Sequence, residues 1–301
     1  MTLIFIVGAT ATGKSALAIE IAKQLRGEIV NADSMQLYKG MNIGTAKLSI
    51  AERDGIPHHL IDTLEVTEDA SVARYQEQAR SCIDNLLKRN VPTVVVGGTG
   101  LYVKAILDDL NFPETNLEIR EKIQKESEAI GAIALHRRLG KLDPAAAAAI
   151  PKENVRRVIR ALEVIEITGK PFTANLPRGQ SSRYPEAKQF GLSLNRENLR
   201  EIIDQRVEKM WHAGFVDEVR NLLSHGLREG KTARAAIGYS QIIKFIDGEI
   251  SEDEAREDTK RATRQYARRQ ETWFSRDARI TWLAKEAQLQ QILSTTLGAK
   301  R

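Results

Sequence analysis

The chain carries a phosphate-loop signature directly after an apolar run, and this order constrains its fold more than any other feature. Residues 3–7 read Leu-Ile-Phe-Ile-Val, which is typical of a buried strand, and residues 8–15 read Gly-Ala-Thr-Ala-Thr-Gly-Lys-Ser. A helical stretch, Ala16 to Arg26, follows at once. A strand, a glycine-rich turn and a helix start in this order are the context in which Gly-x4-Gly-Lys-Ser cradles phosphate. We therefore predict a strand–loop–helix unit that binds phosphate.

The residue types in this loop suit a polyphosphate. Gly8 and Gly13 let the backbone curl so that successive N–H groups point inward, and the helix dipole adds positive potential there. Lys14 supplies a point charge, and the Ser15 hydroxyl is a candidate Mg²⁺ ligand. The residues expected to bind the phosphates are Gly8, Ala9, Thr10, Ala11, Thr12, Gly13, Lys14 and Ser15. The loop alone leaves open whether the ligand is a nucleotide.

Composition narrows the class of protein. At 301 residues, with 42% hydrophobic and 28% charged residues, the chain is ordinary for a soluble enzyme of one or two domains. No stretch approaches the roughly 20 apolar residues that a membrane span needs. Cys82 is the only cysteine, which excludes a disulfide within the chain and a cysteine-based zinc site. We expect a cytoplasmic protein with no membrane partner, and a monomer because nothing in the chain demands a partner subunit.

Strand-like runs alternate with helical stretches in the first part of the chain. The runs are Leu3–Val7, Glu28–Ala32 and Thr93–Val96, and helices such as Ser71–Arg89 separate them. Alternation of this kind is typical of a parallel sheet with crossover helices. We predict an α/β fold with a P-loop NTPase-like parallel sheet core and helices on both faces.

Three polar or glycine-rich segments each fall just past a predicted strand. They are Gly8–Ser15, Asp33–Ser34 and Gly97–Thr99. Ligands gather at the carboxyl ends of the strands in parallel sheets. We therefore expect the three segments to converge on one edge of the sheet.

The pattern changes after residue 113. From Leu117 to about Thr168 it is helical throughout, and Val155–Ile167 is one of the helices. After a loop rich in polar residues, Pro and Gly, a β-like run, Phe190–Leu194, leads into a long helix, Arg196–Trp211. We predict that residues 114–189 form an all-helical insertion, and that residues 1–113 and 190–301 form the α/β core with C-terminal basic helices.

Asp33 is the first candidate for chemistry. A carboxylate at the end of a strand beside a phosphate loop can bind Mg²⁺ or act as a general base. A turn cap is the alternative, and Asp33 taken alone favours it. Gln36 follows with an amide suited to reading a base edge. The most apolar strand, Thr93–Val96, ends in Gly97-Gly98-Thr99-Gly100 without the acidic residue that an ordinary ATPase carries there, which argues against a motor or ATPase.

Basic residues are concentrated near the C-terminus. From Arg256 to Arg279 eight basic residues stand against four acidic ones. Lys260, Arg264 and Arg268 recur at i, i+4, which places them on one helix face. Tyr266 and Trp273 lie on another face, and Arg156 and Arg160 share a face elsewhere. A solvated surface and a nucleic-acid contact both fit these patterns.

Taken together, these segments resemble the bacterial tRNA dimethylallyltransferases, also called tRNA isopentenyltransferases. Residues 33–47, Asp-Ser-Met-Gln-Leu-Tyr-Lys-Gly-Met-Asn-Ile-Gly-Thr-Ala-Lys, match the most diagnostic block of that family. The other matching blocks are residues 8–15, 57–62, 97–102, 160–164, 237–239 and 263–270. The chain departs from the family at Ala9, where proline is common, and at Ser15, where threonine often stands. It also has Ala235-Ala236 where many relatives carry a polar or basic residue, which affects one expected tRNA contact.

The resemblance implies transfer of a dimethylallyl group from dimethylallyl diphosphate to N6 of the adenosine at position 37 of tRNA, with Mg²⁺ as cofactor. By family position, Asp33 would be the general base, Thr99 would lie near the acceptor and the allylic substrate, and Arg206 would stabilise the leaving diphosphate. Residues implied to contact tRNA are Asp33, Ser34, Met35, Gln36, Thr99, Arg120, Arg156, Arg157, Val158, Ile159, Arg160, Gly238, Tyr239, Arg268, Arg269, Gln270 and Trp273.

Two other activities remain open at this point. A relative that prenylates free adenine nucleotides would need neither the helical insertion nor the arginine-rich helix. A small-molecule P-loop kinase would transfer a phosphoryl group from ATP to an acceptor.

Overall fold

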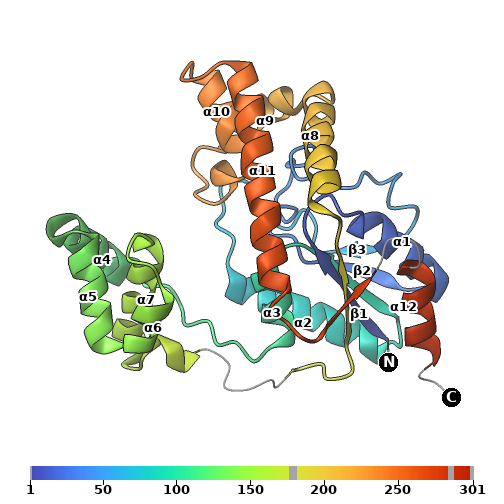
Figure 1. Ribbon diagram of the computed structural model, residues 1–301, viewed down its shortest axis with the longest axis horizontal. Coiled ribbons are helices and arrows are strands. Elements are labelled where there is room, and N and C mark those ends of the chain that lie inside the picture. Colours follow the sequence, from blue (N-terminus) through green and yellow to red (C-terminus); the bar gives the residue numbers. More distant parts are fainter. Residues whose placement is uncertain (1, 176–181, 284–287, 299–301) are drawn as a thin grey trace. The chain divides into compact units, whose positions relative to one another are not determined.

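The computed structural model describes residues 2–175, 182–283 and 288–298. The chain divides into two compact units, one of residues 1–106 and 184–301 and the other of residues 107–183 (Figure 1). This division lies several residues before the boundaries at 114 and 189 expected from sequence. The two connecting segments pair with each other at this division. The Arg183 N–H donates to the Leu107 carbonyl at 2.7 Å, and Asp108 and Ser182 form an isolated antiparallel β-bridge.

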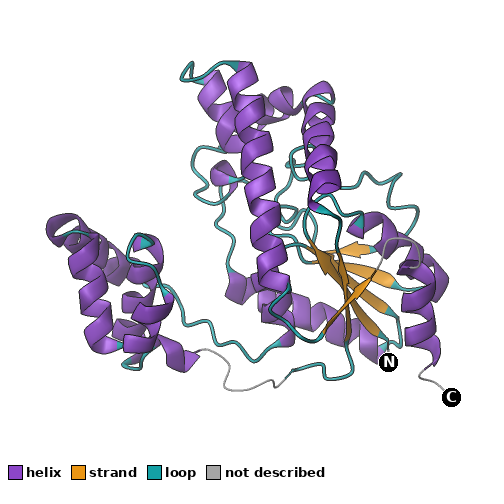
Figure 2. Ribbon diagram, in the orientation of Figure 1, coloured by secondary structure: helices purple, strands orange, loops and turns teal. Residues whose placement is uncertain are grey.

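The larger unit contains a six-stranded sheet in which every pairing is parallel (Figure 2). Its order is β3-β2-β4-β1-β5-β6. The strands are β1 (Leu3–Gly8), β2 (Glu28–Asn31), β3 (His58–His59), β4 (Thr93–Gly97), β5 (Lys188–Leu192) and β6 (Ile280–Leu283). The parallel α/β architecture predicted from sequence is confirmed.

Helices cover the sheet and extend beyond its carboxyl edge. In this unit they are α1 (Lys14–Leu25), α2 (Val72–Lys88), α3 (Gly100–Leu107), α8 (Arg196–His212), α9 (Phe215–Ser224), α10 (Tyr239–Ile246), α11 (Glu252–Phe274) and α12 (Gln288–Leu297), with a short 3₁₀ helix at Ala233–Ala235. Ile4 and Ile6 of β1 pack in one apolar cluster with α1 residues such as Ile21 and with Ile292 of α12. Helices α2 and α3 lie on the other side of the sheet (Figure 1).

Helices α8 and α11 pack against each other and against the phosphate loop. Ala9 and Ala11 of the loop share an apolar cluster with Leu199 and Ile203 of α8 and with Ala267 of α11. The C-terminal helices are thereby joined to the carboxyl end of β1, where ligands are expected in a parallel sheet.

The smaller unit is helical over its described residues. It consists of α4 (Leu117–Ile130), α5 (Ala132–Leu142), α6 (Pro144–Ala149) and α7 (Val155–Thr168), followed by a 3₁₀ turn at Phe172–Asn175. Side chains of Asn116, Asp143 and Asn154 cap the starts of α4, α6 and α7. Ile123, Leu139 and Leu162 are among the buried residues of its separate core. Over the described ranges of the whole chain, no helix is long and apolar enough to cross a membrane.

Candidate active site and nucleic-acid contacts

The phosphate loop joins β1 to α1 with the backbone geometry that the motif requires. Gly8 has φ +142°, and a Cβ there would lie 2.4 Å from the carbonyl oxygen of Leu192 on the neighbouring strand β5. Gly13, with φ +88°, precedes the first residue of α1, Lys14. The loop therefore ends at a helix N-terminus whose free N–H groups favour an anion.

Lys14 points back over the loop. Its ammonium donates to the Ala9 carbonyl at 2.5 Å. Burial lowers the pKa of Lys14 to about 8, the Asp33 carboxylate opposes this shift, and the nearby Arg206 charge adds to it. An anionic ligand would restore the missing negative partner and favour the charged form of Lys14.

Arg206 of α8 faces the same loop. Its Nη1 donates to the Thr10 hydroxyl at 3.5 Å, and its side chain is half-buried. Burial lowers the pKa of Arg206. Within the described parts of the chain no carboxylate pairs with Arg206. Two cations thus lie at the phosphate loop, and both have lost hydration without an ion-pair partner among the residues that the structure describes.

Asp33 lies immediately after β2, in a turn built by Asn31. The Asn31 amide accepts from the Asp33 N–H and donates to the Asp33 and Leu60 carbonyls, each at 2.9 Å. Asp33 Oδ1 accepts from the Met35 N–H at 2.9 Å. Burial raises the pKa of Asp33, while the Met35 N–H and the Lys14 charge oppose the rise. Asp33 therefore does cap its turn, and it is also close enough to Lys14 for their charges to interact.

Thr99 joins the loop after β4 to the loop after β2. Its hydroxyl accepts from the Ser34 N–H at 3.1 Å and lies 3.4 Å from the Ser34 hydroxyl. The Tyr266 hydroxyl of α11 is hydrogen-bonded to Thr99, and burial with the nearby Asp33 charge raises the pKa of Tyr266 to about 12. Tyr266 is a site residue that the sequence reasoning missed. The signal was present in the block at residues 263–270, but Tyr266 was interpreted there only as part of an aromatic face.

Gln270 connects the phosphate loop to the loop after β4. Its Oε1 accepts from the Thr10 N–H and its Nε2 donates to the Gly98 carbonyl, both at 2.8 Å. A Cβ at Gly98 would lie 2.2 Å from Nε2 of Gln270, so the absence of a side chain there permits this contact. Gln270 was expected to contact tRNA. It is instead buried, at 5% exposure, and its amide is occupied within the protein.

Several other expected tRNA contacts on the larger unit lie in different environments. Arg268 and Arg269 are exposed on α11, and Trp273 is 39% exposed with the Lys104 ammonium 5.7 Å from its ring centre. Gly238 and Tyr239 are buried, and the Tyr239 side chain has no exposed surface.

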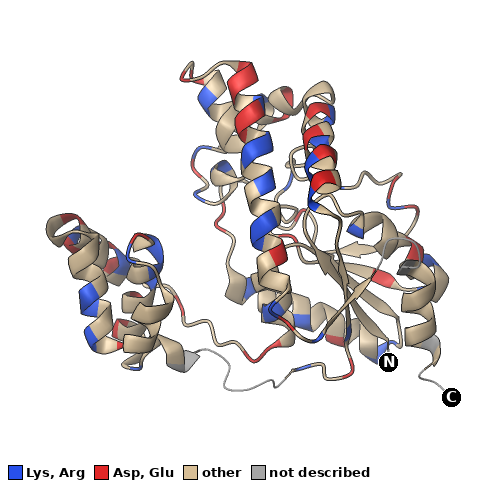
Figure 3. Ribbon diagram, in the orientation of Figure 1, with Lys and Arg blue, Asp and Glu red and all other residues tan. Residues whose placement is uncertain are grey.

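The basic face predicted on α11 is only partly free. Lys260 pairs with Glu208 at 2.5 Å, and Arg264 pairs with Asp204 at 2.5 Å, both acids being on α8. Figure 3 shows acidic residues on α8 beside basic residues on α11. These two cations join the helices, so they do not belong to a freely solvated face. Arg268, one turn further on, remains exposed.

The arginines of the smaller unit also divide into two groups. Arg120 and Arg160 both pair with the fully buried carboxylate of Glu163, at 2.8 and 3.0 Å. Arg156 and Arg157 are exposed at the start of α7. Two further residues expected to contact tRNA, Val158 and Ile159, have side chains in the core of the unit at 1% and 5% exposure.

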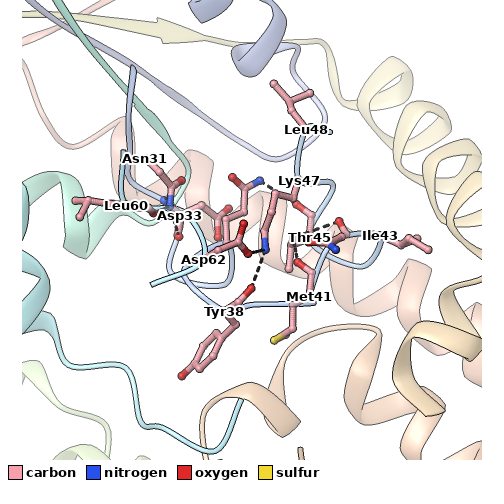
Figure 4. A network of polar contacts seen from close by, with 12 residues as sticks. Asn31, Asp33, Tyr38, Met41, Ile43, Thr45, Lys47, Leu48, Leu60 and Asp62 are labelled. Carbon is pink, nitrogen blue, oxygen red and sulfur yellow. Dashed lines mark hydrogen bonds and ion pairs between the residues drawn. The ribbon is translucent and has the colours of Figure 1, made fainter. Parts of the chain in front are cut away.

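Residues 34–47 form a loop that is held from inside the protein. Gln36 Nε2 donates to the Thr45 carbonyl at 3.1 Å. Lys47, whose side chain is 2% exposed, donates to the Tyr38 carbonyl at 2.7 Å and to Asp62 at 2.6 Å (Figure 4). Ser34 and Met35 are half-buried in the same loop. Lys47 was part of the matched block, but its spacing gave no sign that it would be internal.

The family profile, the related sequences and the solved structures that match this chain all belong to one family. A profile of the IPP transferase family matches residues 36–277. A tRNA dimethylallyltransferase of Thermobifida fusca is 55% identical over 291 residues, covering 95% of this chain and 91% of the relative. One from Streptomyces griseus is 55% identical over 280 residues, covering 93% and 89%.

Two solved structures share the fold over nearly all of the chain. The crystal structure of a tRNA isopentenylpyrophosphate transferase from Bacillus halodurans is 38% identical, with a TM-score of 0.72 and coverage of 99% and 96%. A eukaryotic dimethylallyltransferase captured acting on tRNA is 26% identical, with a TM-score of 0.79 and coverage of 99% and 77%.

Proposed function

Because the chain belongs to the IPP transferase family, we propose that it transfers a dimethylallyl group from dimethylallyl diphosphate to N6 of the adenosine at position 37 in tRNA. Diphosphate is released. The observation that carries this proposal is the convergence of Lys14 and Arg206 on the phosphate loop with Asp33 in interaction distance of Lys14. The family assignment agrees with the resemblance inferred from sequence.

The leaving group is handled by the phosphate loop. As the allylic C–O bond breaks, negative charge grows on the diphosphate. Loop N–H groups, the Lys14 ammonium and the Arg206 guanidinium are oriented donors in a partly dehydrated site, where such stabilisation is strongest. The two cations are held in place before the substrate arrives, since Lys14 bonds to Ala9 and Arg206 to Thr10.

Magnesium fits this site as a partner of the substrate. The described residues contain no group of three or more His, Cys, Asp or Glu side chains that could hold a metal by themselves. Mg²⁺ commonly binds through one or two protein oxygens together with substrate phosphates. Ser15 is half-buried beside Lys14 and would contribute its hydroxyl. Bound there, Mg²⁺ would neutralise charge on the diphosphate oxygens.

The acceptor chemistry falls to Asp33 and Thr99. N6 of adenine is a weak nucleophile because its lone pair is delocalised into the ring. Asp33 would hydrogen-bond N6 and accept its proton as the C–N bond forms and the C–O bond to diphosphate breaks. The raised pKa of Asp33 makes it a better proton acceptor than an exposed carboxylate. Thr99, tied to Ser34 and Tyr266, would hold the acceptor side of the site.

RNA recognition is proposed for the exposed cations. The target base lies in a single-stranded loop and must be extruded to reach the phosphate loop. Ser34, Met35 and Gln36 would line its path, and Arg268 and Arg269 would contact the phosphate backbone. Arg156 and Arg157 of the smaller unit, together with Arg120 and Arg160 beside Glu163, would add phosphate contacts. The chain would act as a monomer in the cytoplasm, where tRNA is available.

The test supplies dimethylallyl diphosphate, Mg²⁺ and an anticodon stem-loop with adenosine at positions 36, 37 and 38. We expect the RNA to gain the mass of one dimethylallyl group, and nuclease mapping to locate it at position 37. Parallel reactions contain adenosine monophosphate as acceptor or ATP as donor. Prenylation of the free nucleotide in preference to RNA, or phosphoryl transfer from ATP, would overturn the proposal.

A further inference from the structure

Glu218 of α9 binds the backbone of the loop that follows Gln36. Its Oε2 accepts from the N–H groups of Asn42 and Ile43 at 3.0 and 2.7 Å. Its Oε1 accepts from the Gly44 N–H at 3.3 Å and from the Tyr239 hydroxyl at 2.6 Å. One carboxylate thus satisfies three consecutive backbone donors and one side-chain donor. The family blocks quoted above do not include Glu218.

Tyr239 supports this carboxylate from inside the protein. Its side chain is fully buried, and burial together with the Glu218 charge raises its pKa well above the usual value of 10.0. The hydroxyl therefore stays protonated and donates to Glu218. Tyr239 also packs edge-on against Phe215, with ring centres 4.9 Å apart, so its position is fixed. This accounts for a residue that was expected to contact tRNA and yet has no exposed surface.

The backbone that Glu218 holds leads directly to the amide of Gln36. Thr45 follows Gly44, its hydroxyl donates to the Met41 carbonyl at 2.6 Å, and its own carbonyl accepts from Gln36 Nε2 at 3.1 Å. A carbonyl can only face the NH₂ side of the amide, because the opposite orientation would bring two oxygens together. The orientation of the Gln36 amide therefore depends on where the Thr45 carbonyl lies.

An amide with fixed orientation can tell adenine from guanine. With Nε2 turned to Thr45, Gln36 presents Oε1 as an acceptor and one remaining N–H as a donor. Adenine offers an amino donor beside a ring-nitrogen acceptor, whereas guanine has a carbonyl oxygen in place of the amino group. A Gln36 amide free to rotate would lose much of this discrimination.

We propose that Glu218, together with Tyr239, is a specificity-positioning residue: by holding residues 42–44 it fixes the Thr45 carbonyl and so orients Gln36 toward an adenine base. Glu218 does not touch the RNA or the diphosphate in this arrangement. It acts on base recognition and leaves the phosphate-loop chemistry unchanged. This inference rests on the proposed function in taking an adenine of RNA as the ligand of Gln36.

The test measures binding as well as turnover for Glu218→Gln. The probes are two fluorescently labelled anticodon stem-loops that differ only in adenosine or guanosine at position 37. We expect Glu218→Gln to reduce the preference for adenosine by about tenfold, the scale of one amide–base contact. KM for the adenosine stem-loop should rise, while KM for dimethylallyl diphosphate and kcat at saturating RNA should change less than twofold. Asp217→Asn, which alters an exposed acid of the same helix, is the matched control and should change none of these values.

A double-mutant comparison separates orientation of Gln36 from a general structural effect. If Glu218 acts through Gln36, then adding Glu218→Gln to Gln36→Ala produces no further loss of preference. Tyr239→Phe, which removes one donor from Glu218, should give a smaller loss than Glu218→Gln. Additive losses in the double mutant, an unchanged preference in Glu218→Gln, or an equal fall in kcat and diphosphate affinity would overturn the inference. Failure of the unmodified protein to prenylate the adenosine stem-loop would instead contradict the proposed function.

Discussion

Replacement of Gln270 by alanine tests whether the phosphate loop is held in shape by its neighbours. The Gln270 amide is buried and bridges the Thr10 N–H and the Gly98 carbonyl. Gln270→Ala would leave both backbone groups without a partner. An unsatisfied buried polar group costs about 1–3 kcal/mol, and partial entry of water reduces the sum for the pair to about 2–4 kcal/mol. For a unit of this size, in which each kcal/mol shifts the unfolding midpoint by about 2–4 °C, we expect the midpoint to fall by about 4–16 °C.

The same change should weaken phosphate binding. Thr10 lies in the loop that would surround the diphosphate, and its hydroxyl is also the contact of Arg206. Without the hydrogen bond from the Thr10 N–H to Gln270, the phosphate loop is less ordered in the free protein and must become ordered when diphosphate binds. A cost of about 1.4 kcal/mol for this ordering corresponds to a tenfold weaker Kd for diphosphate. Calorimetric titration with diphosphate and thermal unfolding of the full chain measure the two effects on one sample.

Gln265→Ala is the matched control, because Gln265 is the same residue type on the same helix and is exposed. It should change the midpoint by less than about 2 °C, since exposed substitutions away from special features have effects within about 0.5 kcal/mol. Gln270→Glu adds a second comparison. It retains an acceptor for the Thr10 N–H but brings a carboxylate oxygen against the Gly98 carbonyl, so it should be no better than alanine. A Gln270→Ala protein with the stability and diphosphate affinity of the control would refute the reasoning.

Three further predictions concern the proposed chemistry and RNA contacts. Asp33→Ala should lower single-turnover prenylation by about 10²–10⁴, the range of a general base, with diphosphate affinity retained; comparable turnover would remove Asp33 from that role. In the protein without ligand the pKa of Lys14 is about 8, so raising the pH through 8 removes the charge of Lys14. The affinity for diphosphate should therefore fall between pH 7 and 9. The diphosphate affinity of Lys14→Arg should stay constant over that range. Arg268→Ala should reduce the slope of log K against log salt for stem-loop binding by about one. Lys260→Ala removes a lysine that pairs with Glu208, so this variant should leave the slope unchanged. Equal slopes for the two variants would contradict the distinction between the exposed Arg268 and the paired Lys260.

Local elements were predictable because their signals are short in range. The helix expected over residues 71–89 is α2, and both of its expected end residues cap it. Strand β1 begins at Leu3 as expected and runs one residue further, to Gly8. The run expected at 190–194 begins at Lys188 instead, because its pairing with β1 sets Lys188 opposite Ile4. Strands β3 and β6 were not predicted: β3 has only two residues, and β6 reads Ile-Thr-Trp-Leu with no glycine-rich or polar segment of the site beside it.

The roles of charged and polar residues were harder to predict, because they depend on the partner helix. A spacing of i, i+4 places Lys260, Arg264 and Arg268 on one face, but only the packing of α8 decides that the first two are paired. Burial of Gln270 and Tyr239 likewise depends on segments far away in the sequence, the loops of Thr10 and Gly98 for Gln270 and helix α9 for Tyr239. A motif identifies which residues belong to a site. It does not distinguish a residue that contacts the ligand from one that positions its neighbour.

The loop after β4 shows why this phosphate site suits a carbon–oxygen bond cleavage better than phosphoryl transfer. In an ordinary ATPase an acidic residue at this strand end would assist the metal. Here the Gln270 side chain occupies the space that a side chain at position 98 would need, since a Cβ on Gly98 would lie 2.2 Å from Gln270 Nε2. An acid could not be accommodated without displacing the bridge to Thr10. The next residue, Thr99, turns to Ser34 and Tyr266 instead. The strand end that serves the metal in an ATPase therefore connects the phosphate loop to the loop of Asp33, the proposed general base.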